Sequence, residues 1–502
     1  MSLAFTVAAL VAAQAPAPPA FRAALVVGVN EAFDDSQAAL RYADDDAARY
    51  AELLGPQVEH LELLTVLDPE SQELFPQAAK QARLPDAAGL DQALERLKAL
   101  ADGARALGRR TELYFVYVGH GRVRGGEGEV RLLGGALSRS RLTTAVLEDR
   151  HFDRKHLMVD ACSAYLLVNA RGESDEEVDA AFERFLEGQT LDRFPDVGAV
   201  LATSGAGPTH EWSRYQGGVF SHELRSALTG AADADDDGKV AYGEVEAFLA
   251  SANLQVPALK GRPKVFVRAP RIEQAAALVE LDQDLPALEL PAELAGHYVL
   301  EDARGLRYAE LHKEAGFVMA LRLQPERAYA LLTSDGDELL RIPAPSGVTK
   351  LRLPLEPVPA RGWDRGGVAL PGEVKDAPPG AFDAPYGPRF MAGFWARLRA
   401  ESAAQGELTV VTPQRSYARP VLGYVALGVG GVAAGLAAWQ ASVASSRYDA
   451  YLVTYSASEK RQLEGEVKDA RLRAGSLGAA AGVAVATGVS LLLWEWLSST
   501  EQ

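Results

Sequence analysis

The chain has 502 residues, of which 48% are hydrophobic and 24% are charged, so it is long enough for two or three globular domains. Its formal net charge of −17 argues against nucleic acid as a partner and agrees with a basic substrate or with a soluble surface. Cys162 is the single cysteine, which excludes a disulfide within the chain.

The first 20 residues form an apolar run that ends in small residues and prolines, a pattern typical of a secretory signal. Ala13-Gln14-Ala15 fits a cleavage site, although the absence of Lys and Arg from this segment is atypical. We therefore predict a signal peptide at 1–20 and export of the protein. The alternatives are a short membrane anchor and a disordered leader.

From residue 21 to 270 the chain alternates between apolar runs and helical patterns. Strands are predicted at 23–29, 61–67, 113–118, 156–160, 198–203 and 264–268, with helical patterns such as 43–54, 89–107, 219–228 and 242–251 between them. This alternation predicts an α/β fold with a mostly parallel sheet that is covered by helices on both faces.

Two of these strands end in residues that can do chemistry. The apolar runs at 113–118 and 156–159 lead into Gly119-His120-Gly121 and Asp160-Ala161-Cys162, and catalytic groups collect at the carboxyl edge of such sheets. Only a thiolate attacks a carbonyl well, and a nearby imidazole can take the thiol proton. Cys162 is therefore the predicted nucleophile and His120 the general acid–base, with the N–H groups of Gly121 and Cys162 as oxyanion donors. The alternative is a buried core thiol and a hydrogen-bonded turn histidine.

The ordered set of motifs resembles the caspase-like peptidases, and the bacterial and metacaspase branch more than the animal caspases. The resemblance covers about residues 22–270 and implies a caspase-like sheet of six strands, with a catalytic dyad at His120 and Cys162. The matching segments are Ala24-Leu25-Val26-Val27-Gly28-Val29-Asn30, Leu40-Arg41-Tyr42-Ala43-Asp44-Asp45-Asp46-Ala47, Gly119-His120-Gly121, Asp160-Ala161-Cys162, Ala202-Thr203-Ser204-Gly205 and Gly218-Val219-Phe220-Ser221.

The resemblance also implies a substrate class. In the metacaspase branch the Asp two residues before the cysteine lines a pocket for a basic P1 side chain, the residue before the cleaved bond, and Asp160 occupies that position. Glu211 follows the next strand, where the family places pocket loops, and is predicted as a second acid. His210 in the same segment is a weaker rival for the role of His120. The chain departs from the family pattern at 163–165, where Ser-Ala-Tyr replaces the usual His-Ser-Gly or Arg-Gly.

A calcium-loop pattern is present at 233–244, flanked by helical patterns on both sides. Carboxylates at loop positions one, three and five, a backbone carbonyl at seven and a bidentate Glu at twelve are the ligands that Ca²⁺ takes in such loops. The predicted ligands are Asp233, Asp235, Asp237, Lys239 and Glu244. An acidic turn without a metal is the alternative.

The rest of the chain changes character. Residues 271–357 alternate in short apolar segments and predict a small β-rich accessory domain, and 358–419 predict a linker followed by an amphipathic helix. Two uncharged apolar stretches, 420–440 and 475–497, are predicted to form a two-helix transmembrane hairpin. The basic residues of the connecting segment, 441–474, place it in the cytoplasm. A soluble Ala/Gly-rich hairpin is the alternative.

Together these patterns predict a cysteine endopeptidase, exported and anchored in a lipid bilayer, that cleaves after Arg or Lys and depends on calcium. A non-catalytic scaffold with a degraded peptidase domain is the competing class, and the changed residues at 163–165 favour it. A caspase-like peptidase that cleaves after Asp is a further alternative, which the predicted pocket acids disfavour because they would repel an Asp side chain.

Overall fold

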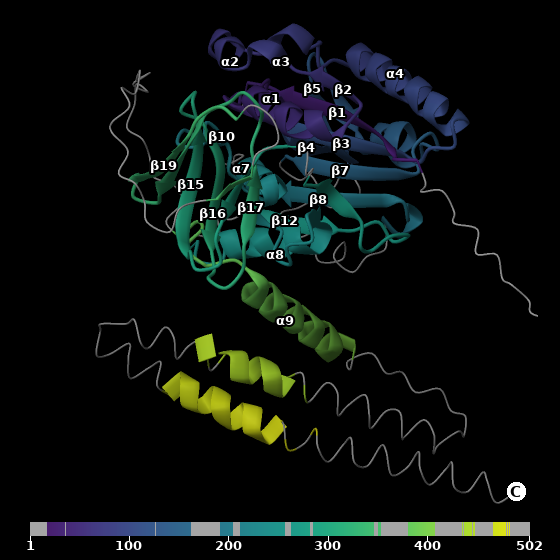
Figure 1. Cartoon of the computed structure of the whole chain (residues 1–502). Coiled ribbons are helices and arrows are strands. Elements are labelled where there is room, and N and C mark those ends of the chain that lie inside the picture. The colour runs from purple at the N-terminus through teal and green to yellow at the C-terminus, as the bar shows by residue number, and fades with distance from the viewer. Residues whose placement is uncertain are drawn as a thin grey trace, which may run out of the picture. The chain divides into compact units, whose positions relative to one another are not determined.

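The computed structural model describes residues 18–161 except 36 and 126, then 191–203, 211–256, 263–281, 285–345, 350–352 and 380–406, and parts of 434–446 and 465–481. The chain divides into two compact units, 1–387 and 388–502 (Figure 1). Most of the predicted signal peptide, the nucleophile Cys162 and the rival His210 lie outside the described residues.

A six-stranded sheet forms the centre of the first unit, in the order β12-β8-β7-β3-β1-β2. All neighbours are parallel except β12, which runs antiparallel to β8. The strands are β1 (Phe21–Val29), β2 (His60–Leu64), β3 (Thr111–Gly119), β7 (Arg154–Asp160), β8 (Val197–Thr203) and β12 (Lys264–Arg268). The predicted mostly parallel sheet is therefore confirmed.

Helices cover both faces of this sheet, as the uninterrupted apolar strands require. On one face, alternate residues of β1 such as Leu25 and Val27 pack with Leu90, Leu94 and Leu97 of α4 (Ala87–Ala106) in one core. Each such buried side chain contributes about 1.5–3 kcal/mol. The other face carries α1 (Ala43–Leu54), α7 (Val219–Ser226) and α8 (Tyr242–Ala252) (Figure 1).

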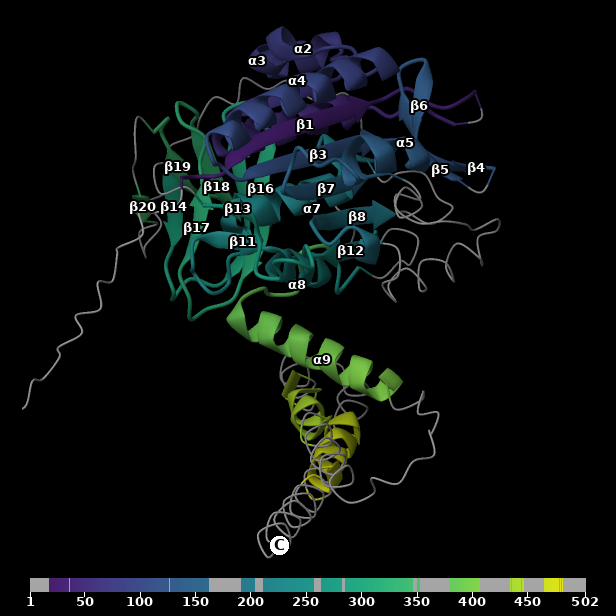
Figure 2. The same ribbon diagram turned by 90° about the vertical axis from the view of Figure 1, so that its right-hand side faces the viewer.

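A small three-stranded sheet directly follows β3. It consists of β4 (Gly121–Arg124), β5 (Glu127–Leu132) and β6 (Gly135–Ser138), and the chain returns to β7 through α5 (Arg139–Leu142) and the π-helical turn η2 (Thr143–Leu147). Figure 2 shows this sheet and the β-rich region at opposite ends of the central sheet. The strands were not predicted, because their charged and glycine-rich sequence lacks long apolar runs.

Shorter elements complete the segments around the central sheet. They are η1 (Gly55–Gln57), α2 (Pro69–Leu74), α3 (Pro76–Gln81), η4 (Leu191–Arg193), β9 (Glu211–Trp212), β10 (Gly217–Gly218), η5 (Ala227–Ala231) and β11 (Lys239–Ala241). The two strands β9 and β10 form a hairpin that leads directly into α7.

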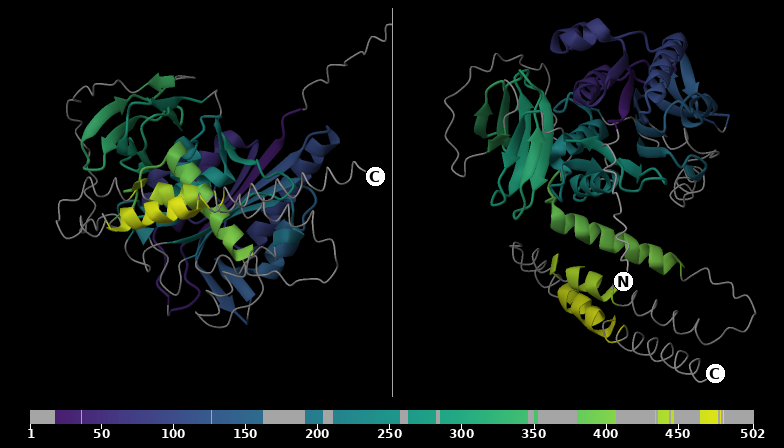
Figure 3. Two further views of the ribbon diagram at one scale, coloured as in Figure 1. Left: turned by 90° about the horizontal axis from the view of Figure 1, so that it is seen from below. Right: turned by 45° about the vertical axis from the view of Figure 1, so that its right-hand side comes forward.

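The segment expected to be β-rich contains strands β13 to β20, and its strand β16 packs on α7 of the α/β part (Figure 3). The strands are β13 (Ala277–Glu280), β14 (Ala287–Leu290), β15 (Gly296–Asp302), β16 (Arg307–Lys313), β17 (Met319–Arg322), β18 (Tyr329–Thr333), β19 (Glu338–Ile342) and β20 (Lys350–Arg352). They form sheets ordered β17-β14-β20 and β16-β15-β18-β19, while β13 pairs with β11.

The end of the expected linker is part of the first unit. Phe382 and Tyr386 are buried, and the Tyr386 hydroxyl donates to the backbone carbonyl of Ala232 at 2.8 Å. Residues 380–387 therefore close the calcium-loop region rather than serve as a spacer.

In the second unit, the helix predicted after the linker is present as α9 (Pro388–Gly406). The predicted membrane spans at 420–440 and 475–497 lie largely outside the described residues. Within the part of the chain that the structure describes, no helix combines the length and the apolar character needed to cross a bilayer.

Candidate functional site

His120 lies directly after β3 at the carboxyl edge of the sheet and is only 3% exposed. Its Nε2 lies 3.0 Å from the backbone carbonyl of Ala38, which can only accept a hydrogen bond, so this nitrogen carries the proton. Its Nδ1 is buried and has no hydrogen-bond partner among the described residues. Burial lowers the pKa of His120, so the imidazole is neutral near pH 7 and its Nδ1 can accept a proton.

The loop that supplies the Ala38 carbonyl is fixed by Asn30, the residue after β1. The Asn30 side chain accepts from the backbone N–H of Ala43 at 2.8 Å and donates to Asp44 at 2.7 Å. The backbone of Asn30 also accepts from the N–H of Leu40 at 2.8 Å. These bonds join the end of β1 to the start of α1 and thereby hold the imidazole of His120 in one orientation.

Gly121 follows His120 and opens β4. The N–H of Arg131 donates to the carbonyl of His120 at 2.9 Å, and Gly121 pairs with Val130 across the hairpin. This pattern makes Gly121 and Val130 a non-hydrogen-bonded pair, so the N–H of Gly121 points away from β5. The N–H predicted as an oxyanion donor is therefore not used by the strand ladder.

Strand β7 runs beside β3, and Val118 pairs with Asp160 in their parallel register. His120 stands two residues after Val118, and in the sequence Cys162 stands two residues after Asp160. Parallel neighbouring strands lie about 4.8 Å apart. The register therefore brings the two strand ends that carry the predicted dyad to adjacent places on one edge.

Asp160 is the last residue of β7 and is buried. Its Oδ2 accepts from the hydroxyl of Ser221 at 2.6 Å and from the Ser221 backbone N–H at 3.2 Å, at the start of α7. Burial raises the pKa of Asp160 to about 6, and the nearby Asp46 carboxylate adds to the shift. The predicted pocket acid thus lies at the expected edge, already bonded to α7.

Asp46 is a second carboxylate at this place, and the sequence reasoning assigned it no site role. It accepts from Arg225 Nη1 at 2.6 Å and from the backbone N–H of Gly218 at 2.6 Å. A Cβ on Gly218 would lie 2.8 Å from Asp160 Oδ2 and 3.3 Å from Asp46 Oδ2, so the two carboxylates face the same glycine. The run of three Asp residues at 44–46 was the available signal, but it is equally typical of a helix N-terminus.

Glu211 comes from β9 and reaches across to the start of α1. Its two carboxylate oxygens accept from the backbone N–H groups of Arg41, at 2.9 and 3.1 Å, and of Tyr42, at 2.8 Å. Burial, with a contribution from the carboxylates of Asp46 and Asp160, raises the pKa of Glu211 to about 7. The predicted second acid therefore lies within electrostatic reach of both aspartates, and it also binds the two residues that precede α1.

The predicted calcium loop follows α7 and η5 in the chain. Carboxylate oxygens of Asp233, Asp235 and Asp237 lie within 4.8 Å of one another. Gly238 has a φ of +76°, which permits the sharp turn that the loop needs. Glu244 accepts from the N–H groups of Ala234 at 3.0 Å and Ala241 at 2.9 Å.

The electrostatics of this loop suit a cation. Burial raises the pKa of Asp233 to about 6 and that of Glu244 to about 7, and neighbouring aspartates contribute to both shifts. Carboxylate and carbonyl oxygens are the donors that Ca²⁺ prefers, and a bound cation would relieve their mutual repulsion. The residues present therefore fit a hard divalent ion.

No protein-family model and no curated protein matches this chain.

Proposed function

We propose that the protein is a caspase-like cysteine endopeptidase that cleaves after Arg or Lys. The observation that carries the proposal is His120 at the end of β3, next to the strand that leads to Cys162. Its Nε2 lies on the Ala38 carbonyl, and its Nδ1 has no hydrogen-bond partner in the described part of the chain.

In this proposal Nδ1 of His120 takes the proton of the Cys162 thiol. The thiolate attacks the carbonyl carbon of the cleaved bond, and the imidazolium then returns the proton to the leaving amine. Water hydrolyses the resulting thioester. The Ala38 carbonyl keeps the imidazole in the required tautomer and stabilises the imidazolium, because its hydrogen bond to Nε2 strengthens when the ring is charged.

The N–H groups of Gly121 and Cys162 would hold the oxyanion of the tetrahedral intermediate. The support for Gly121 is its unused N–H, which the non-hydrogen-bonded pairing with Val130 directs away from the β4–β5 ladder. Removing one such donor typically costs 10²–10³ in rate, so this N–H is chemically valuable if the proposal holds.

The preference for a basic side chain rests on three carboxylates: Asp160, Glu211 and Asp46. They come from three different elements, yet Asp46 helps to raise the pKa of Asp160, and both aspartates help to raise that of Glu211. A substrate guanidinium or ammonium would be attracted to Asp160 and Glu211, whereas an Asp side chain would be repelled.

Two further parts of the proposal rest on the sequence pattern. Asp233, Asp235, Asp237, the carbonyl of Lys239 and Glu244 would hold Ca²⁺, which would stiffen the turn between α7 and α8 and take no chemical step. The apolar stretches 420–440 and 475–497 would anchor an exported catalytic unit in a membrane.

The test is a panel of fluorogenic peptides with Arg, Lys or Asp at P1, presented to the purified full chain with and without Ca²⁺. We expect cleavage of the Arg and Lys peptides and complete loss of cleavage in Cys162→Ala. Cleavage that survives in Cys162→Ala would overturn the proposed nucleophile, and cleavage of only the Asp peptide would overturn the proposed pocket. If no peptide is cleaved with calcium present, a scaffold role becomes the better assignment.

A further inference from the structure

The β9–β10 hairpin, which carries Glu211, is held at its turn by a buried tyrosine. Tyr215 is 1% exposed, its backbone N–H donates to the carbonyl of Trp212 at 3.0 Å, and its carbonyl accepts from Arg49 at 2.9 Å. Its ring stacks on the imidazole of His222, with the two ring centroids 4.1 Å apart and an angle of 17° between the ring planes. The turn is therefore fixed to α7, the helix into which the hairpin leads.

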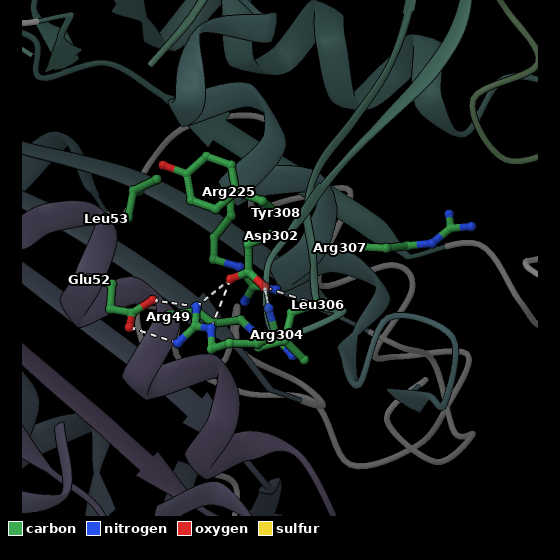
Figure 4. Close-up of a pocket in the computed structure, with 9 residues that line it drawn as sticks. All are labelled: Arg49, Glu52, Leu53, Arg225, Asp302, Arg304, Leu306, Arg307 and Tyr308. Carbon is green, nitrogen blue, oxygen red and sulfur yellow. Dashed lines mark hydrogen bonds and ion pairs between the residues drawn. The ribbon is translucent and has the colours of Figure 1, made fainter. Parts of the chain in front are cut away.

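The β-rich region supplies a further contact to this tyrosine. The guanidinium carbon of Arg307 in β16 lies 5.8 Å from the centre of the Tyr215 ring, within the range of a cation–π contact. The same guanidinium donates to Glu310 at 2.5 Å. A small cavity lies at this boundary, lined by residues of α1, α7 and the β-rich region (Figure 4). Arg307 lines it too, but its guanidinium points away from the other arginines in Figure 4.

Glu310 of β16 joins the two side chains that contact the tyrosine. It is 2% exposed, and its Oε2 lies 3.4 Å from Nε2 of His222. Its Oε1 lies 2.8 Å from Nε2 of His297 in β15, and its backbone N–H donates to the hydroxyl of Ser226 in α7 at 3.0 Å. Burial opposes its ionisation, but the contacts with His222 and His297 and the charge of Arg307 lower its pKa. One charged carboxylate therefore connects the β-rich region to α7.

The β-rich region is also fixed to α1. At the small cavity, Glu52 of α1 binds Arg304 through both oxygens at 3.0 Å and Arg327 through both oxygens at 2.8 Å. Asp302 accepts from Arg304 as well, at 2.6 and 2.9 Å. The β-rich region thus has a defined place against α1, the helix that begins just after the two N–H groups that bind Glu211.

We propose that the β-rich region belongs to the P1 pocket, because Tyr215 and Glu310 position the hairpin that carries Glu211. The hairpin has only two strand pairs, and so short a pair of strands is marginal on its own. The hydrogen bonds of Glu211 hold its carboxylate, and the ring of Tyr215 holds the turn that follows. Tyr215 and Glu310 are therefore positioning residues, and their role in the pocket rests on the proposed peptidase function.

Loss of this anchor should affect binding more than chemistry. Glu211 would contact the P1 side chain and not the atoms that react, so a displaced hairpin should raise KM for the Arg peptide while kcat changes little. The same loss should speed hydrogen exchange of the hairpin amides, among them the hydrogen-bonded N–H groups of Tyr215 and Gly218. Hydrogen exchange therefore reports the anchor without requiring any peptidase activity.

The experiment combines hydrogen exchange of segment 211–218 with kinetics on the Arg and Lys peptides, both in the full chain. Tyr215→Leu removes the ring stack, so exchange should speed up about tenfold and KM should rise about fivefold. Tyr215→Phe should restore wild-type values, because the Tyr215 hydroxyl has no hydrogen-bond partner among the described residues. Glu310→Gln removes the charge that holds Arg307 and should act in the same direction, so it provides a second test if Tyr215→Leu fails to fold.

The matched control is Tyr298→Leu, a change at another buried tyrosine of the β-rich region. Tyr298 is 6% exposed, and its hydroxyl donates to the carbonyl of Ala295 at 3.0 Å within the same region. This variant should weaken the β-rich region locally but leave both the exchange of segment 211–218 and KM at wild-type values.

Unchanged exchange of segment 211–218 in both Tyr215→Leu and Glu310→Gln would overturn the proposal, because the hairpin would then be held without the β-rich region. Equal effects in Tyr298→Leu would also overturn it, since general loosening would explain them. Faster exchange with an unchanged KM would show that the hairpin is no part of the pocket. If the wild type cleaves no peptide, the proposed peptidase function fails, and the exchange measurements still decide whether Tyr215 and Glu310 hold the hairpin.

Discussion

The two polar clusters on α1 handle buried charge in different ways. At the sheet edge, Asp160 and Glu211 are satisfied by a hydroxyl and by backbone N–H groups. In the small cavity one turn away, lined by Arg49 and Arg225, both arginines lie near Asp46, while Asp45 and Asp302 also act on Arg49. Three of their guanidinium donors have no partner among the described residues. The sheet-edge carboxylates are therefore held by hydrogen bonds, whereas the described residues leave part of each of the two guanidinium groups without a hydrogen-bond partner.

The carboxylates and the guanidinium groups differ because different hydrogen-bond partners are available near each of them. Backbone N–H groups at helix starts satisfy carboxylates without adding charge, and α1 and α7 both begin at the sheet edge. A guanidinium can only donate, and the carbonyls inside a helix are already bonded. A buried arginine must therefore find a carboxylate, a loop carbonyl or a bound anion.

The largest expected effect concerns the sheet edge. His120→Gln should lower kcat/KM for the Arg peptide by about 10²–10⁴, because the general base is lost. Because burial lowers the pKa of His120 below its ordinary 6.5, the acid limb of the wild-type rate profile should lie below pH 6.5. His151→Gln, a change at a 41% exposed histidine before β7, should leave the rate unchanged. An equal loss in both variants would point to general damage instead of catalysis.

The second effect tests whether the paired part of the cavity is structural. Glu52→Gln should reduce the free energy of unfolding by about 2 kcal/mol, since Arg304 and Arg327 lose a shared and largely buried partner. Urea unfolding of both proteins measures this difference. Glu59→Gln breaks the ion pair with Arg109 at a 50% exposed carboxylate and should cost less than about 1 kcal/mol.

The pH dependence of Glu52 has a definite sign. Burial opposes its ionisation, but hydrogen bonds from Arg327 and Arg304 outweigh burial and lower its pKa. A lowered carboxyl pKa stabilises the folded protein above the ordinary value of 4.5, and this contribution is lost as the pH falls through the folded pKa. The wild type and Glu52→Gln should therefore converge in stability at acidic pH.

The third prediction concerns a substitution that should stabilise the folded protein. Asp160→Asn should increase the free energy of unfolding at pH 7.5 by about 1–3 kcal/mol, because burial raises the pKa of Asp160 to about 6 and its charge destabilises the fold. The folded protein binds the proton of Asp160 more tightly than the unfolded chain does. The free energy of unfolding that is lost to the buried charge therefore grows as the pH rises from 3.8 to about 6, and nothing is lost below pH 3.8. The gain should therefore shrink at pH 4.

The same variant should lower kcat/KM for the Arg peptide, which would identify the charge as a functional feature with a stability cost. Asp91→Asn, at a 56% exposed carboxylate, is the control for both measurements. A destabilised Asp160→Asn would show that the carboxylate at the sheet edge is held mainly for structure.

Much of the central sheet could be predicted because its signal is local. The uninterrupted apolar runs predicted all six strands, and the positions of His120 just after β3 and of Asp160 at the end of β7 placed both residues at one edge. The carbonyl of Ala38 could not be predicted, because any residue offers a carbonyl and only the loop path aims it at the imidazole.

The cavity could not be predicted either. Its arginines come from α1, α7 and the β-rich region, and each is unremarkable in its own segment, where charged residues on helices and loops are usually solvated. The place of Asp46 at the sheet edge was not predicted for a related reason. Acidic residues such as its neighbours are common at a helix N-terminus whether or not a site is present. Partners that are distant in sequence and joined by no periodic pattern become visible only in the fold.

The smallest expected effect extends the comparison to the calcium loop, where Glu244 is held by backbone N–H groups as the sheet-edge carboxylates are. Glu244→Gln should weaken Ca²⁺ binding about tenfold, because one charged ligand is lost. Burial raises the pKa of Glu244 to about 7 and that of Asp233 to about 6, so protons should compete with the ion and wild-type affinity should fall between pH 7.5 and 5.5. Calorimetric titration with CaCl₂ at both pH values measures this fall in affinity.

The control is Glu246→Gln, which removes a neighbouring carboxyl outside the ligand pattern. Burial also raises the pKa of Glu246 to about 7, so the two residues are alike in ionisation, and the control should leave Ca²⁺ affinity unchanged. Equal weakening in both variants would show that the overall charge of the loop region matters and that position twelve does not.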